Sequence, residues 1–84
     1  MKKLTGYSVI NIKVAELYRN RILAKLDEAM DEAIDFSQEW HIFGATKHWV
    51  QEEADAKWMF DNRKKDAIEI AFDLYTDGAL SKAW

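Results

Sequence analysis

Six carboxylates lie within a stretch of fourteen residues, where they could bind a cation or a basic protein surface. Residues 26–39 read LDEAMDEAIDFSQE and contain no lysine or arginine. If this stretch is helical, four pairs of acids are spaced i,i+4, and each pair repels by about 0.2–0.5 kcal/mol. The acids therefore form either a binding surface or a solvated face that keeps the protein soluble. They are Asp27, Glu28, Asp31, Glu32, Asp35 and Glu39.

Other chemistry has few residues to build on. His41 and His48 are the only histidines, and His48 and Glu52 have the i,i+4 spacing of a helical metal-binding pair. A di-metal site in a helical bundle uses Glu-x-x-His motifs, which this sequence lacks. The sequence also lacks cysteine, a glycine-rich phosphate loop and a nucleophile elbow. We therefore predict no catalytic residue, no cofactor and no metal site, and we keep metal binding as the least favoured alternative.

The composition favours helices as the elements that carry these acids. The chain has 84 residues, of which 49% are hydrophobic, and this predicts one domain spanning residues 1–84. Proline is absent and only three glycines occur, so helix breakers are rare. We predict an all-α fold, with a helical hairpin and a third helix. A short N-terminal strand within residues 7–14 is the alternative there, because Ile10, Ile12 and Val14 alternate with polar residues.

Glycine and threonine suggest where the hairpin turns. The first helix is expected to begin at about Asn11 and to end near residues 40–42. Gly44 then has the position of a helix stop, and Thr46 that of the next N-cap. The second helix is expected over about residues 47–60, and the third over about residues 64–75. The predicted core includes Met30, Ile34, Trp40, Ile68 and Phe72.

The net charge of −3 hides a strong asymmetry along the chain. Residues 1–25 contain six lysines and arginines and one glutamate, whereas residues 26–62 contain ten acids and two lysines. An isolated helix prefers the opposite order, with acids near its N-terminus. If the hairpin folds at Gly44, Glu52 and Glu53 come to lie beside the acidic half of the first helix. That end of the hairpin is then strongly negative.

Two kinds of partner are disfavoured. Direct nucleic-acid binding conflicts with the acidic balance, and the basic run Arg63-Lys64-Lys65 is short. Membrane insertion conflicts with the absence of an apolar run of about 18 residues. The start Met1-Lys2-Lys3 lacks the apolar segment of a signal peptide, so a cytoplasmic location is expected.

These observations predict a non-enzymatic binding protein whose acidic helix face meets a basic protein. Carboxylates that recur every ~6 Å along a helix approximate the spacing of phosphates, so the expected partner handles nucleic acid. In size and acidic polarity the chain is similar in kind to small phage-encoded inhibitors, such as anti-CRISPR or anti-restriction proteins, although no motif carries this likeness. The alternative is self-association, for example as a homodimer held by opposite charges. The predicted partner-binding residues are Asp27, Asp31, Glu32, Asp35, Glu39, Glu52 and Glu53.

Overall fold

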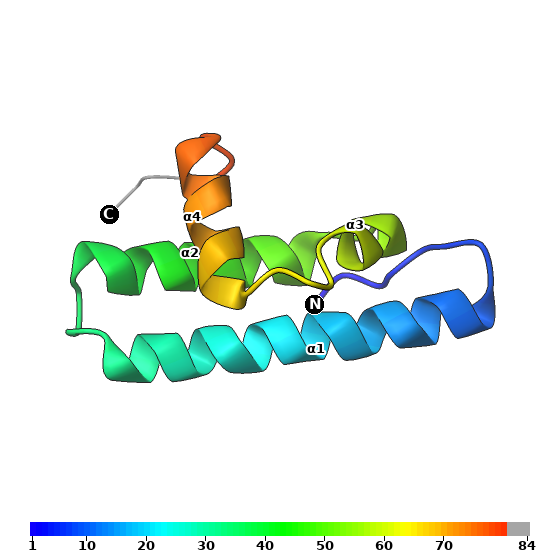
Figure 1. Ribbon diagram of the computed structural model, residues 1–84, viewed down its shortest axis with the longest axis horizontal. Coiled ribbons are helices and arrows are strands. Elements are labelled where there is room, and N and C mark those ends of the chain that lie inside the picture. Colours follow the sequence, from blue (N-terminus) through cyan, green and yellow to red (C-terminus); the bar gives the residue numbers. More distant parts are fainter. Residues whose placement is uncertain (81–84) are drawn as a thin grey trace.

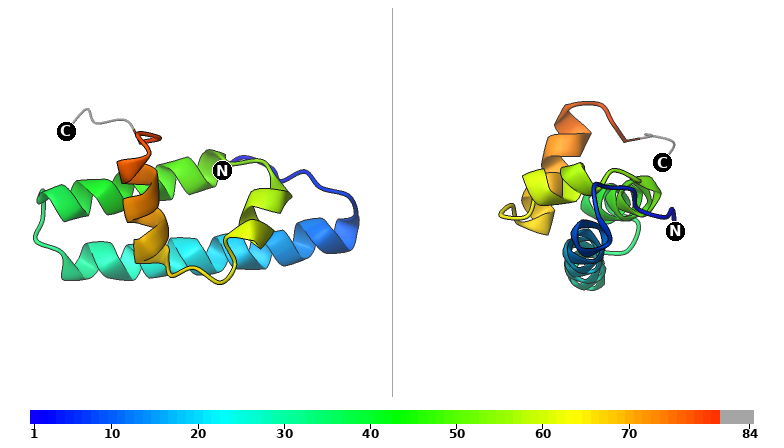
Figure 2. Two further views of the ribbon diagram at one scale, coloured as in Figure 1. Left: turned by 45° about the horizontal axis from the view of Figure 1, so that its top comes forward. Right: turned by 90° about the vertical axis from the view of Figure 1, so that its right-hand side faces the viewer.

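The computed structural model describes residues 1–80, which form four helices and no strand. Helices α1 (Val9–Glu32) and α2 (Gln38–Glu52) lie side by side as an antiparallel hairpin, and α4 (Ala67–Thr76) crosses this hairpin steeply (Figure 1). The short helix α3 (Ala56–Asp61) and α4 lie on the same side of the hairpin (Figure 2). The predicted all-α fold with a helical hairpin is confirmed, while the region beyond the hairpin holds two helices instead of one.

Each helix begins at a serine or aspartate whose side chain accepts a hydrogen bond from a backbone N–H of the first turn. At the start of α1 the cap is Ser8, and the expected cap Asn11 is instead the residue that donates to it, at 3.1 Å. Residues 9–14 are helical, so the alternative of a strand there is wrong. Within residues 1–80, the β-type backbone pairing is limited to one isolated bridge, between Thr5 and Asp55.

The predicted turn at Gly44 is wrong, because α2 continues through it. A Cβ at Gly44 would lie 3.4 Å from Cε of Met30, so this glycine faces α1 at a close helix contact. Thr46 is fully buried within α2, and its hydroxyl donates to the Ile42 carbonyl at 2.8 Å, as interior threonines in helices do. The glycine and threonine thus serve packing between helices and not the chain reversal.

The chain reverses at residues 33–37, without glycine or proline. The backbone of Ala33 is extended, with a ψ of 154°, and so ends α1, while its N–H still donates to the carbonyl of Ala29 at 3.0 Å. Phe36 then adopts a φ of 64°, the left-handed conformation that costs a non-glycine residue about 1–2 kcal/mol. Ser37 caps α2 by accepting from the N–H of Trp40 at 3.2 Å.

The hydrophobic core lies where α1, α2, α3 and α4 meet, and includes Leu26, Ile42, Val50, Met59 and Ile70. Of the predicted core residues, Met30 and Trp40 are half-buried, whereas Ile34, Ile68 and Phe72 are exposed. Ile34 leaves the core because α1 ends two residues before it. Helix α4 is rotated from its expected orientation, so that its buried stripe consists of Ala67, Ile70, Ala71 and Leu74.

The N-terminal segment is held against the start of α3. Leu4 is buried, Thr5 donates its N–H to Ala54 at 2.7 Å, and Thr5 accepts from the N–H of Ala56 at 3.0 Å. The buried Arg19 of α1 donates to the Lys2 carbonyl at 2.6 Å. This segment therefore closes one end of the hairpin.

Candidate functional site

Five of the seven predicted partner-binding residues lie around the reversal between α1 and α2, which we call the hairpin tip (residues 27–40). Asp27, Asp31 and Glu32 belong to the last two turns of α1, Asp35 lies in the loop, and Glu39 lies in the first turn of α2. Asp27 forms an ion pair with Lys47 of α2 at 2.6 Å. Its charge is thereby partly neutralised, and the pair ties the two helices together.

The expected placement of Glu52 and Glu53 beside these acids is wrong. Because the turn lies at residues 33–37, these two residues end α2 at the opposite end of the hairpin, about 20 Å from Glu39 along the helix. Glu53 accepts a hydrogen bond from the N–H of Asp55 at 3.0 Å, so it orders the link to α3. Neither residue lies beside the tip acids.

The remaining tip acids are exposed and carry unneutralised charge. Within residues 1–80, no lysine or arginine forms an ion pair with Asp31, Glu32, Asp35 or Glu39. Glu39 lies at a helix N-terminus, which favours a negative charge. Asp31 and Glu32 lie in the last turn of α1, where each negative charge costs about 0.3–1 kcal/mol. The fold therefore gains nothing from the charges of Asp31 and Glu32.

Large apolar side chains project into solvent between these acids. Ile34 is 82% exposed and Phe36 is 75% exposed. The ring of Phe36 lies against that of Trp40, with 5.1 Å between centroids, and Trp40 meets His41 edge to face. Sequence reasoning placed Ile34 in the core and gave Phe36 no role. Ser37 followed by Glu39 is typical of the start of a helix. This pattern would have placed residues 33–36 in a loop and so predicted that Ile34 and Phe36 are exposed.

A hollow of about 310 Å³ adjoins the tip between α1, α2 and α4. Its lining includes the apolar residues Ala33, Ile34, Phe43 and Ile68. Glu32 and Glu39 line it as well. A concavity with both apolar and acidic lining can accept an apolar side chain of a basic partner.

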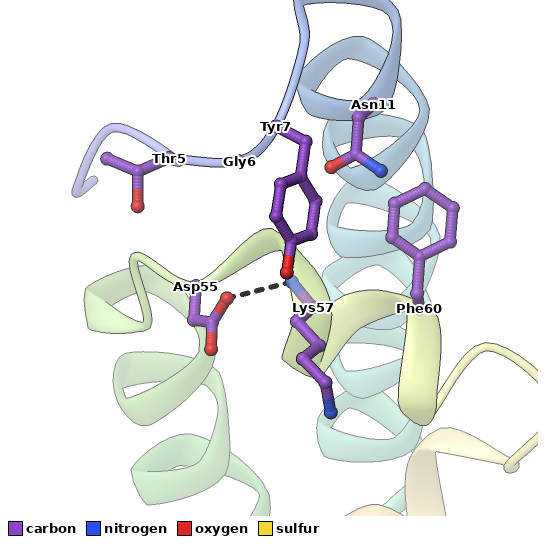
Figure 3. Close-up of a pocket in the computed structure, with 7 residues that line it drawn as sticks. All are labelled: Thr5, Gly6, Tyr7, Asn11, Asp55, Lys57 and Phe60. Carbon is purple, nitrogen blue, oxygen red and sulfur yellow. Dashed lines mark hydrogen bonds between the residues drawn. The ribbon is translucent and has the colours of Figure 1, made fainter.

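A second hollow, of about 600 Å³, lies at the other end of the molecule, where the N-terminal segment passes α3. Figure 3 shows the Tyr7 ring beside Asp55 and Lys57. A hydrogen bond of 2.8 Å from Lys57 to Asp61 raises the pKa of that lysine above 10.5. This lysine of the lining is thus already paired with Asp61.

The histidines do not join a cluster of metal-binding groups. His48 and Glu52 are both exposed on α2. Among the 80 described residues, no group of three His, Cys, Asp or Glu side chains is placed to hold a metal ion. None of the helices in this part of the chain is both long and apolar enough to cross a membrane.

Comparisons of the chain with known protein families, with curated proteins and with solved structures find no match.

Proposed function

We propose that the protein is a small non-enzymatic binding protein that presents its hairpin tip to a basic surface of a partner protein. The observation that carries this proposal is the grouping of unpaired acids around exposed apolar side chains. Asp31, Asp35 and Glu39 are exposed and unpaired within the described part of the chain, and Ile34 and Phe36 project between them.

Each part of this arrangement has a separate role in binding. Apolar and aromatic side chains at the centre of an interface supply most of the affinity when a partner covers them. Charges around them steer the approach of an oppositely charged partner and select against the wrong one. The strained backbone at Phe36 is in keeping with this role, since left-handed non-glycine residues cluster at binding sites.

A nucleic-acid-handling protein is the specific partner we propose. Its arginines and lysines normally contact phosphates, and carboxylates can replace phosphates by accepting charge-assisted hydrogen bonds from them. A protein bound in this way competes with nucleic acid, so the proposed activity is inhibition. Binding should weaken steeply as salt rises, because exposed charges are screened within about 10 Å at 0.1 M salt.

The test is a pair of charge reversals matched in number. The double variant Asp31→Lys with Asp35→Lys changes the tip, while Glu16→Lys with Glu52→Lys makes the same net charge change away from it. Partners are captured from a lysate of the native host at low salt, and binding of a synthetic arginine-rich peptide is titrated in parallel. The tip variant should lose both interactions and keep its circular dichroism spectrum, while the matched control should keep both.

Equal loss of binding in the two double variants would contradict the proposal, because net charge alone would then explain it. Unchanged binding by the tip variant would show that the tip acids are only a solvated face.

A further inference from the structure

Four charged residues form a stripe along one side of α1, and we call them the α1 stripe. Arg21, Lys25, Glu28 and Glu32 follow at intervals of four, three and four residues, which places them on one face of the helix. All four are exposed. The stripe therefore changes from positive to negative along its length.

The α1 stripe lines a groove between α1 and the start of α4. One hollow of about 320 Å³ is lined by Arg21, Lys25 and the basic run Arg63-Lys64-Lys65. The next hollow, of about 190 Å³, is lined by Lys25, Glu28, Glu32 and Ile68. The two hollows share Lys25 and Asp66 and therefore adjoin, and together we call them the groove. Arg21 and the basic run line one half of it, and Glu28 and Glu32 line the other half.

The charges of the α1 stripe reverse their sign about its midpoint. Arg21 and Glu32 lie equally far from the midpoint, and so do Lys25 and Glu28. When a second α1 is laid antiparallel on the stripe, each positive residue faces a negative one. Arg21 then faces Glu32 of the other copy, and Lys25 faces Glu28 of the other copy. The same pairs recur on the other side of the two-fold axis.

We propose that this groove binds a second copy of the chain, with the two α1 helices antiparallel about a two-fold axis. Such an interface is self-complementary, as two-fold dimers require. A uniformly basic peptide would be repelled at the Arg21 half, and a nucleic acid would be repelled at the half that carries Glu28 and Glu32. The groove therefore fits a partner with negative charges opposite its basic half and positive charges opposite its acidic half. An antiparallel α1 of a second copy has this order of charges.

Lys25, Glu28 and Glu32 are available for this contact, whereas Arg21 is exposed but already donates to the Arg63 carbonyl and lies over the Tyr18 ring. The ion pair between Lys25 and Glu28 within one chain is long, at 3.8 Å, and both side chains are more than 60% exposed. Such a pair is weak and can be exchanged for one between copies. Ile68 is 45% exposed beside these residues, so the second copy would also cover apolar surface.

This proposal does not rest on the proposed function of the tip. The groove shares Glu28 and Glu32 with the hairpin tip, but neither Asp31 nor Asp35 lines it. Reversal of Asp31 and Asp35 therefore tests partner binding, while changes at Lys25 and Glu28 test self-association.

The experiment measures the mass of the purified chain by sedimentation equilibrium at low and high salt. The wild type should reach twice the monomer mass of 9.8 kDa at low salt and return to the monomer at high salt. Lys25→Glu and Glu28→Lys should each weaken dimerisation by roughly ten- to thirtyfold, because two attractive pairs become repulsive. An equimolar mixture of these two variants should form a heterodimer, since every pair is again attractive.

The matched controls are Lys13→Glu and Glu16→Lys, which have the same i,i+3 spacing on α1 but lie outside the stripe. Each should dimerise as the wild type does. A wild type that stays monomeric at low salt up to about millimolar concentration would overturn the proposal, whether or not the groove binds a foreign peptide. A dimer whose affinity is the same in the Lys25→Glu and Glu28→Lys variants would overturn it as well.

Discussion

Replacement of Phe36 by glycine separates the stability of the hairpin tip from its proposed function. Phe36 is strained at a φ of 64°, is 75% exposed, and contacts Trp40 through its ring. Glycine should relieve about 1–2 kcal/mol of left-handed strain. It should lose about 0.5–1.5 kcal/mol of ring contact and about 0.5–1 kcal/mol of additional backbone entropy.

These contributions nearly cancel, so the Phe36→Gly protein should lie between about 1 kcal/mol more stable and 1.5 kcal/mol less stable than the wild type. A buried phenylalanine would cost about 3–5 kcal/mol on truncation. The comparison variant is Phe36→Ala, which loses the ring but keeps the strain. The glycine variant should therefore be at least as stable as the alanine variant, the reverse of the usual order in helices and strands.

The assay is unfolding in urea, monitored by far-ultraviolet circular dichroism. Fluorescence is not used as the probe, because loss of the Phe36 ring would itself change the emission of Trp40. Binding of the partner or of the arginine-rich peptide is measured on the same samples and should fall for both variants. A loss of more than about 3 kcal/mol would show that the Phe36 ring is packed into the fold. An alanine variant clearly more stable than the glycine variant would show that residue 36 is not left-handed in solution.

Two further outcomes follow from α1 and α3. Leu26→Ala should lower the free energy of unfolding by about 2–5 kcal/mol, since Leu26 is fully buried. Leu17→Ala on the same helix, at a site 67% exposed, should change it by less than about 0.5 kcal/mol in a parallel urea series. Asp61 raises the pKa of Lys57, so their contact stabilises the fold below pH 10.5 and is lost as the pH rises through the raised value. The difference in melting temperature between wild type and Asp61→Asn should therefore shrink at high pH, and a difference that grows with pH would contradict the assignment.

The fold class was predictable from sequence because its causes are local. The rarity of helix breakers and the helical spacing of apolar residues are properties of short stretches. The position of the turn was not predictable from Gly44, because that glycine is explained by its contact with Met30 on another helix. The actual reversal is marked by Ser37, but it places a phenylalanine in a conformation that glycine usually fills.

The candidate site was also predictable only where it depends on residues close in sequence. The tip acids lie near one another whether the chain turns at Gly44 or at residues 33–37, because they are neighbours in the sequence. The placement of Glu52 and Glu53 depended on the turn and failed with it. The exposure of Ile34 was missed because the periodic pattern was extended through a loop, and the roles of Ile68 and Phe72 depended on how α4 is rotated against the hairpin.

The attachment of the N-terminal segment has a consequence for the order in which the protein folds. Thr5 hydrogen-bonds to Ala54, which is 49 positions later in the chain. During synthesis, α1 can form as soon as its residues leave the ribosome, but the backbone partners of Thr5 follow only with Ala54 and Ala56. Closing so long a loop is an entropically costly step. Residues 4 and 5 should therefore be among the last to gain protection from hydrogen exchange, and the end of the hairpin that carries Tyr7 should close after the tip has formed.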